Sequence, residues 1–239
     1  MEFGVILDVE TTGLDPSKDS IIEIGLLEFG LIPDQEPVIT RMYGALEDPG
    51  CLLPPEIEKL TGIKTPFLQG QKINWVFVRQ MLENASIIIA HNMKFDRDFI
   101  MARPDFSDLA THWGCSCRDI DWDQKGYKSA KLNYLAADHG FVNSFAHRAL
   151  FDCATTFRLI SKHLLELTEN SYTKKVRIDA VNSPFEKKDF LKERGYRWDG
   201  VRRVWTKTVR ETLLPEERIF LANEIYLGPS FHREYAEES

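Results

Sequence analysis

Two acidic residues stand close together at the end of the first apolar segment of the chain. Residues 5–7 read VIL, and Asp8 and Glu10 follow with one residue between them. The apolar run predicts a buried strand, and side chains alternate along a strand, so Asp8 and Glu10 should point to the same face. Like charges this close repel each other, and burial raises the cost. The pair therefore needs a compensating partner.

Further polar residues that could act with this pair follow two other apolar segments. Residues 86–92 (SIIIAHN) read as a strand with a polar end, and Asp96 follows where a helix begins. Farther along, His147 lies in a predicted loop and Asp152 about one turn into a helix. Each has an ordinary alternative: Asp96 could favour a helix N-terminus, His147 could be a surface histidine, and the acid pair could be a solvated rim. Together, converging carboxylates need positive charge.

Divalent cations supply that charge better than the neighbouring basic residues do. Lys94, Arg97 and Arg148 are the bases nearest to the acids, and none has helical spacing to all of them. Oxygen ligands select hard ions such as Mg²⁺ or Mn²⁺ rather than Zn²⁺. Two such ions, about 3.5–4 Å apart, support displacement at phosphorus, and an imidazole can take the proton from the attacking water. The residues thus predict phosphodiester hydrolysis.

The elements that must position these residues follow a mixed α/β pattern. Strands are expected over residues 3–9, 21–29, 38–46 and 86–92, and a turn at 14–20 makes the first two a hairpin. Helices are expected over residues 54–63, 73–84, 95–102, 131–138 and 149–167. Early strands followed by alternating strands and helices favour a mixed sheet with helices on its faces.

Three segments carry a resemblance to a known family. DVETTG, HNMKFD and HRALFD resemble, in order and spacing, the three motifs of the DEDDh (DnaQ-like) 3′–5′ exonucleases, which include the proofreading epsilon subunit of bacterial DNA polymerase III and ribonuclease T. LTGIKTP and KLNYLAADHGF are similar to the family as well. The resemblance covers about residues 1–168 and implies an RNase H-like fold, a mixed five-stranded sheet flanked by helices.

The resemblance also implies roles for individual residues. Four acids would bind two Mg²⁺ or Mn²⁺ ions: Asp8, Glu10, Asp96 and Asp152. His147 would be the general base; the sister subtype has a tyrosine one residue closer to the last acid, where this chain has Arg148. The residues implied to hold the terminal nucleotide are Thr11, Thr12, Leu14, Leu60, His91, Asn92 and Phe95.

Other conspicuous side chains are interpreted as structural. His112, Cys115 and Cys117 lack a fourth ligand for zinc. The four cysteines show no disulfide-framework spacing, which is typical of a reducing compartment. Three tryptophans are expected in or beside the core: Trp75, Trp113 and Trp122.

Charge is distributed unevenly along the 239 residues. Residues 1–173 hold 16 Lys and Arg against 25 Asp and Glu, a net charge of −9. Residues 174–210 hold 12 against 5, and residues 211–239 hold 2 against 7. This pattern predicts an exonuclease domain over residues 1–172 and a small basic α+β module over residues 173–239.

The basic module has local signals of its own. A strand is expected over residues 176–181, a helix opened by a capping box at 183–186, a hairpin at Asp199-Gly200, and a helix over 215–226. Two interpretations stay open. The module is a solvated small domain with Trp198 and Trp205 as its core, or it binds nucleic acid through cations and aromatic rings.

The prediction for the whole chain is a metal-dependent 3′–5′ exonuclease that releases nucleoside 5′-monophosphates from DNA, single-stranded DNA above all. An RNA-trimming exoribonuclease is one alternative, because DNA and RNA offer the same phosphate and 3′-hydroxyl. A catalytically idle nucleic-acid-binding or docking domain is another. A protein partner could dock on the C-terminal module. No secretory signal and no apolar run of about 18 residues is present, so a cytoplasmic protein without membrane contact is expected.

Overall fold

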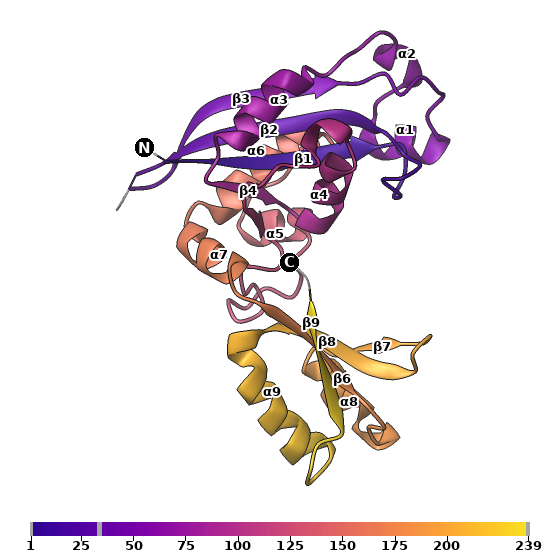
Figure 1. The fold of residues 1–239 in the computed structure, drawn as a ribbon, viewed down its shortest axis with the longest axis vertical. Helices are drawn as coiled ribbons and strands as arrows, with labels where there is room; N and C mark the ends of the chain where they lie inside the picture. Colours follow the sequence, from indigo (N-terminus) through magenta and orange to yellow (C-terminus); the bar gives the residue numbers. More distant parts are fainter. Residues whose placement is uncertain (1, 33–34, 238–239) are drawn as a thin grey trace. The chain divides into compact units, whose positions relative to one another are not determined.

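The computed structural model describes residues 2–32 and 35–237, which divide into two compact units (Figure 1). The first unit spans Met1–Ser171 and the second spans Tyr172–Ser239. Each unit has its own sheet and its own hydrophobic core. None of the helices in the described ranges is both long enough and apolar enough to cross a membrane.

The first unit is built on a five-stranded sheet with the order β3-β2-β1-β4-β5. The strands are β1 (Glu2–Thr11), β2 (Ile21–Leu31), β3 (Val38–Leu46), β4 (Ile87–Ala90) and β5 (Trp113–Cys115). Strand β2 is antiparallel to β1 and β3, whereas β4 is parallel to β1 and β5 is parallel to β4. The predicted mixed five-stranded sheet is confirmed.

Helices cover both faces of this sheet. They are α1 (Pro55–Thr61), α2 (Thr65–Leu68), α3 (Trp75–Glu83), α4 (Met93–Met101), α5 (Leu132–Asp138), α6 (Ala149–Ile160) and α7 (Leu164–Ser171), with a 3-10 helix at Pro104–Phe106. Leu7 packs in a core with residues of α3 and α4, while Ile6, its neighbour in β1, packs with residues of α6 and α7. The single helix expected over residues 149–167 is observed as two helices, α6 and α7, which are separated at residues 161–163.

Helix α6 begins in close contact with the sheet. Gly25 of β2 is the register partner of Asp8 in β1. A Cβ atom at Gly25 would lie 2.4 Å from the carbonyl carbon of Ala149, the first residue of α6. Only glycine leaves room for the helix to start here, so Gly25 allows the first turn of α6 to approach the end of β1.

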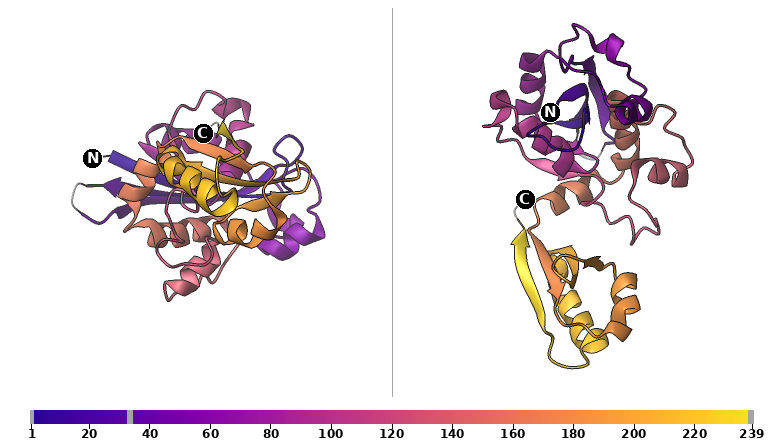
Figure 2. Two further views of the ribbon diagram at one scale, coloured as in Figure 1. Left: turned by 90° about the horizontal axis from the view of Figure 1, so that it is seen from below. Right: turned by 90° about the vertical axis from the view of Figure 1, so that its right-hand side faces the viewer.

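The second unit is a four-stranded antiparallel sheet with the order β7-β8-β6-β9. Its strands are β6 (Lys175–Ala180), β7 (Arg197–Asp199), β8 (Val204–Arg210) and β9 (His232–Glu237). Its helices are α8 (Lys188–Glu193) and α9 (Leu214–Phe220), with 3-10 helices at Phe185–Lys187 and Glu211–Leu213 and a π-helical turn at Leu221–Ile225. The right-hand view of Figure 2 shows the helices of this unit on one side of its sheet.

Several sequence-based predictions for the second unit are wrong in detail. No capping box forms, because Pro184 is the N-cap of a 3-10 helix that has no side-chain cap. The hairpin has a longer turn, since residues 200–203 separate β7 from β8. Trp198 is 52% exposed, because β7 is a three-residue edge strand, and it contacts Trp205 with ring centroids 5.6 Å apart. Trp205 alone of this pair packs against the core.

Candidate active site

The acid pair lies at the end of β1, a strand with neighbours on both sides. Asp8 and Glu10 share the face of Ile6, which is the face covered by α6. Glu10 is 9% exposed, and Asp8 is partly buried. The strand thus presents both carboxylates toward α6, where Asp152 lies in the first turn.

Asp152 and His147 are held together at the start of α6. His147 has a φ of 61°, a left-handed conformation that is uncommon outside glycine. In this conformation its backbone N–H donates to Asp152 Oδ2 at 3.0 Å, and the side-chain amide of Asn143 donates to Oδ1. Glu10, His147 and Asp152 each offer one ligand atom, and these atoms lie within 4.8 Å of one another. The His147 side chain remains exposed.

Asp96 reaches the site from the opposite layer of helices. It lies in the first turn of α4 and is 2% exposed. Its Oδ1 accepts a hydrogen bond of 3.1 Å from the backbone N–H of Val9, between the two acids of β1. The carboxylates of three elements, β1, α4 and α6, therefore lie near one another at the end of β1.

The pKa values show that this cluster lacks positive charge. Burial, together with the carboxylates of Asp152 and Glu23, raises the pKa of Glu10 to about 8. Burial, followed by repulsion from Asp96, Asp152 and Glu10, holds the pKa of Asp8 well above its ordinary range. Burial likewise raises the pKa values of Asp96 and Asp152. Buried oxygen donors that repel one another are the chemistry that a hard divalent cation compensates.

Arg148, the one basic side chain that lowers the pKa of Glu10, already forms an ion pair with Glu23. Arg148 donates to both carboxylate oxygens of Glu23, with Nη2 2.9 Å from Oε1, and Glu23 also accepts from the backbone N–H of Ala149 at 3.2 Å. Glu23 is 6% exposed and is the register partner of Glu10. The pair anchors α6 on β2, and at Glu10 the pKa-lowering effect of Arg148 is smaller than the pKa-raising effect of Glu23.

Glu23 and Asn143 are site residues that the sequence reasoning misses. A signal exists for Glu23, because it is a lone carboxylate within the apolar strand segment IIEIGLLEF, where a charge requires a partner. For Asn143 we find no comparable signal, since it lies in a polar loop whose path the sequence pattern does not define.

Two of the residues expected to hold a nucleotide stabilise the turn after β1. The hydroxyl of Thr11 donates to the carbonyl of Gly13 at 2.5 Å. The hydroxyl of Thr12 donates to Asp19 Oδ1 at 3.2 Å and accepts from the backbone N–H of Ser20 at 2.9 Å. This network fixes the loop that follows the acid pair. The two leucines among the residues expected to hold the nucleotide are solvent-exposed, Leu14 at 84% and Leu60 at 50%.

The other three expected nucleotide-binding residues surround the start of α4. His91 Nδ1 lies 2.8 Å from Ser116 Oγ, and burial lowers the pKa of His91 to about 4, so this imidazole is neutral at pH 7. Asn92 is the N-cap of α4 with a φ of 73°. Phe95 packs against the core beside Phe99, with ring centroids 5.0 Å apart, so its ring is partly occupied by internal packing.

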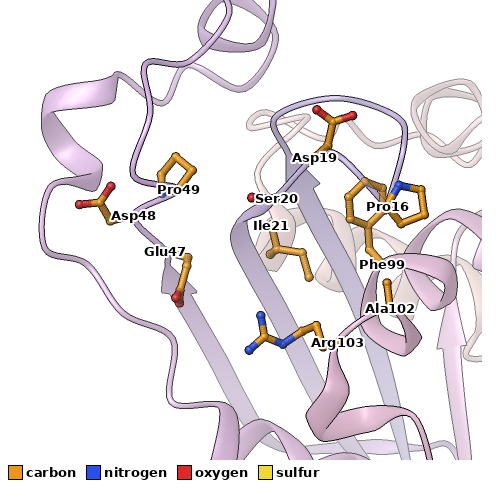
Figure 3. Close-up of a pocket in the computed structure, with 10 residues that line it drawn as sticks. All are labelled: Pro16, Asp19, Ser20, Ile21, Glu47, Asp48, Pro49, Phe99, Ala102 and Arg103. Atoms are coloured by element: carbon orange, nitrogen blue, oxygen red, sulfur yellow. The ribbon is translucent and has the colours of Figure 1, made fainter.

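The side chains interpreted as structural have internal contacts. Trp113 and Trp122 are buried, and Trp75 packs against the core, which confirms that prediction. His112 Nε2 lies 2.9 Å from Ser171 Oγ, and Cys115 Sγ lies 3.4 Å from Cys117 Sγ. A separate pocket beside the turn of residues 14–20 is drawn in Figure 3, where Asp19, Glu47 and Arg103 line it. None of the predicted catalytic residues lines this pocket.

Comparison with known proteins matches the first unit to nucleases and polymerase subunits. A family model described as "Exonuclease" matches residues 5–160. The chain is 29% identical over 168 residues to the DNA polymerase III subunit epsilon of Aquifex aeolicus, covering 68% of this chain and 81% of the relative. It is 28% identical over 197 residues to the PolC-type DNA polymerase III of Thermotoga petrophila, covering 76% of this chain but 13% of that much longer protein.

Among solved structures, the fold is similar to that of E. coli exonuclease I in complex with a dT13 oligonucleotide. The TM-score is 0.60 at 14% identity, and the match covers 88% of this chain and 64% of that chain. At this identity the likeness is one of fold, and it agrees with the mixed sheet and flanking helices described above.

Proposed function

The chain belongs to the exonuclease family and is a 3′–5′ exonuclease of RNase H-like fold, and we propose that it removes nucleoside 5′-monophosphates from the 3′ end of single-stranded DNA. The observation that carries the proposal is the cluster of Glu10, His147 and Asp152 at the end of β1, with Asp8 and Asp96 close enough to repel its charges and Arg148 already paired with Glu23. A domain that only binds nucleic acid has no need to hold such costly groups together.

We assign the four carboxylates, Asp8, Glu10, Asp96 and Asp152, to the binding of two Mg²⁺ or Mn²⁺ ions. Bound divalent ions would supply Lewis acidity to the phosphate and to the attacking water. The donor set fits this role, because it is made of oxygens whose negative charges otherwise repel one another. Asn143 and the backbone N–H of His147 orient the Asp152 carboxylate for this task.

His147 is the proposed general base. Its backbone is fixed by the bond to Asp152, while its imidazole stays exposed beside Glu10 and Asp152. An imidazole can hold a proton taken from water at neutral pH, and such a base contributes about 10²–10⁴-fold to a rate. The Thr11 and Thr12 turn, with Leu14 and Leu60 exposed, is proposed to receive the 3′-terminal nucleotide together with His91, Asn92 and Phe95.

DNA as the substrate is supported by the relatives rather than by the site. The relatives include DNA polymerase III proteins, and the exonuclease I structure holds a deoxythymidine oligonucleotide. The name of the epsilon subunit also supports a protein partner for this chain. We propose the first unit as the exonuclease domain and the second as an accessory module.

The test is an incubation of the purified chain with 5′-labelled single-stranded and double-stranded DNA and RNA. Parallel reactions contain Mg²⁺, Mn²⁺ or a chelator. A ladder that shortens from the 3′ end of single-stranded DNA, and that the chelator abolishes, supports the proposal. If RNA is shortened faster than DNA, RNA is the preferred substrate. Degradation that persists in chelator would contradict the metal assignment.

A further inference from the structure

The sheet of the second unit has one face that its own helices leave uncovered. Val176, Ile178 and Val209 belong to the core formed with α8, α9 and the π-helical turn, so they define the covered face. The alternate residues of the same strands point to the opposite side, toward which no described helix of this unit packs (Figure 2, right). We propose that this opposite side, the open sheet face, binds the backbone of single-stranded nucleic acid.

The first row of residues on the open sheet face crosses all four strands. Strand pairing places Arg197 of β7 opposite Thr206 of β8, Thr206 opposite Asp179 of β6, and Asp179 opposite Arg233 of β9. Arg197 and Arg233 are exposed, and neither has a carboxylate of the described residues within ion-pair distance. The row therefore ends in a free guanidinium at each edge of the sheet.

The second row lies two residues along and adds an aromatic ring. It consists of Thr208, Arg177 and Tyr235. The Arg177 guanidinium lies over the Tyr235 ring, 4.5 Å from its centroid, and Tyr235 is 37% exposed. An aromatic side chain beside arginines is the combination on which bases stack while cations hold phosphates. Lys175 and Arg210 form the next pair along β6 and β8, and Lys175 is in turn the register partner of Glu237 in β9.

The carboxylates of this face pair with Arg177 and Arg202 and leave the charges of Arg197 and Arg233 uncompensated among the described residues. Asp179 pairs with Arg202 at 2.8 Å and with Arg177 at 3.4 Å, and Asp199 pairs with Arg202 at 2.7 Å, so two carboxylates face two arginines. At the centre of the face, Arg177 Nε and Asp179 Oδ1 form an ion pair at 3.4 Å, and Thr206 Oγ1 is buried without a hydrogen-bond partner among the described residues.

The identity of the ligand rests on the proposed function. Residues 1–173 carry a net charge of −9 and must still act on a polyanion, whereas residues 174–210 carry 12 basic against 5 acidic residues. A basic surface on the same chain raises the local concentration of a negatively charged substrate. Single-stranded nucleic acid is complementary to the open sheet face, because its phosphates can pair with the arginines and its unpaired bases can stack on the aromatic ring.

The experiment measures binding of the full chain to fluorescein-labelled dT20 and rU20 by fluorescence anisotropy, in chelator and over a range of salt concentrations. The test variant is R197Q/R233Q, which removes two free cations from the open sheet face. The matched control is K188Q/K192Q, which removes two cations of α8, on the covered side. Tyr235→Ala tests stacking. Circular dichroism checks that each variant is folded.

We expect R197Q/R233Q to reduce the slope of log affinity against log salt by about 1.4, since each phosphate contact to a single strand contributes about 0.7. The control should leave the slope within about 0.3 of wild type, and Tyr235→Ala should weaken binding about tenfold with the slope unchanged. Equal loss in both double variants, or none in either, overturns the proposal. Binding is measured in chelator and cleavage in Mg²⁺, so the two claims are tested separately. If the chain binds the oligonucleotides but does not cleave them in Mg²⁺, only the proposed function is wrong. If it cleaves them but R197Q/R233Q binds as wild type does, only this inference is wrong.

Discussion

Glu10 illustrates what the fold imposes on single residues of the site. It is almost excluded from water, lies opposite another carboxylate in the sheet, and has a pKa raised to about 8. The chain keeps this carboxylate, with Asp8, Asp96 and Asp152, where it destabilises the metal-free fold. We propose that cation binding explains this group, because a bound cation would reverse the sign of its contribution.

The first prediction concerns stability and pH. Between pH 4.5, the ordinary value for glutamate, and pH 8, folded Glu10 holds a proton that the unfolded chain has released. The free energy of unfolding therefore falls as pH rises through this window, by about 1.4 kcal/mol per pH unit for one such group. Thermal midpoints in chelator should decline from pH 5 to pH 8, and Glu10→Gln should decline less steeply. A midpoint that rises over this range would contradict the burial of the cluster.

The second prediction concerns His147. Because its φ is 61°, His147→Asn is the suitable variant, since asparagine tolerates the left-handed region and keeps the backbone bond to Asp152. We expect kcat to fall about 10²–10⁴-fold with little change in KM, because a general base acts on the chemical step. The rise in rate from mildly acidic to neutral pH should also disappear. A variant with the wild-type pH profile would show that His147 has no proton-transfer role.

The sequence predicts the site residues unevenly, and the reason is physical. Asp8, Glu10, Asp96, His147 and Asp152 lie in three short motifs at or near the ends of apolar elements, so local patterns reveal them. Glu23 and Arg148 are 125 residues apart, and their pairing depends on how α6 docks on β2. That docking is a tertiary property, which local spacing does not encode.

Among the elements, α6 matters most because it carries Asp152 and follows His147. Its start is set by Gly25, by the Glu23–Arg148 pair and by the register of β1 against β2. The elements that the sequence predicts best are long: β3 is expected over residues 38–46 and runs over Val38–Leu46. Strands β5 and β9 escape prediction, because β5 has three residues and β9 lies in a charged segment, so that pairing with a neighbour defines each.

The third prediction tests the approach of α6 to the sheet. Gly25→Ala would place a Cβ atom 2.4 Å from the Ala149 carbonyl carbon, so α6 must move away from β1. Forced overpacking of this kind costs typically about 1–3 kcal/mol. We expect a lower thermal midpoint and a larger loss of activity than stability alone explains, because Asp152 moves with the helix. Gly44→Ala is the matched control, since its Cβ would contact only the Leu150 side chain, at 3.2 Å. Equal activity of the two variants would contradict this role of Gly25.

At the level of the whole chain, chemistry and affinity are assigned to different units. The acidic first unit holds the carboxylate cluster, and the basic strands of the second unit form the open sheet face. The fourth prediction follows: R197Q/R233Q should raise KM for long single-stranded oligonucleotides and leave kcat unchanged. Turnover of a dinucleotide should be unaffected, because so short a substrate engages only the active site. A fall in kcat on the dinucleotide would show that the second unit supports the catalytic site itself.

The most direct test of the account compares two aspartates on neighbouring elements of the first unit. Asp8→Asn removes a carboxylate of the proposed metal site, and Asp98→Asn removes the exposed partner of Lys94 from α4 as the matched control. The measurement is the rate of 3′-nucleotide release from a 5′-labelled dT oligonucleotide in saturating Mg²⁺. We predict that Asp98→Asn cleaves at nearly the wild-type rate, whereas Asp8→Asn loses almost all activity while its metal-free thermal midpoint equals or exceeds that of wild type. Cleavage by Asp8→Asn at the wild-type rate would contradict the assignment of these carboxylates to a catalytic metal site.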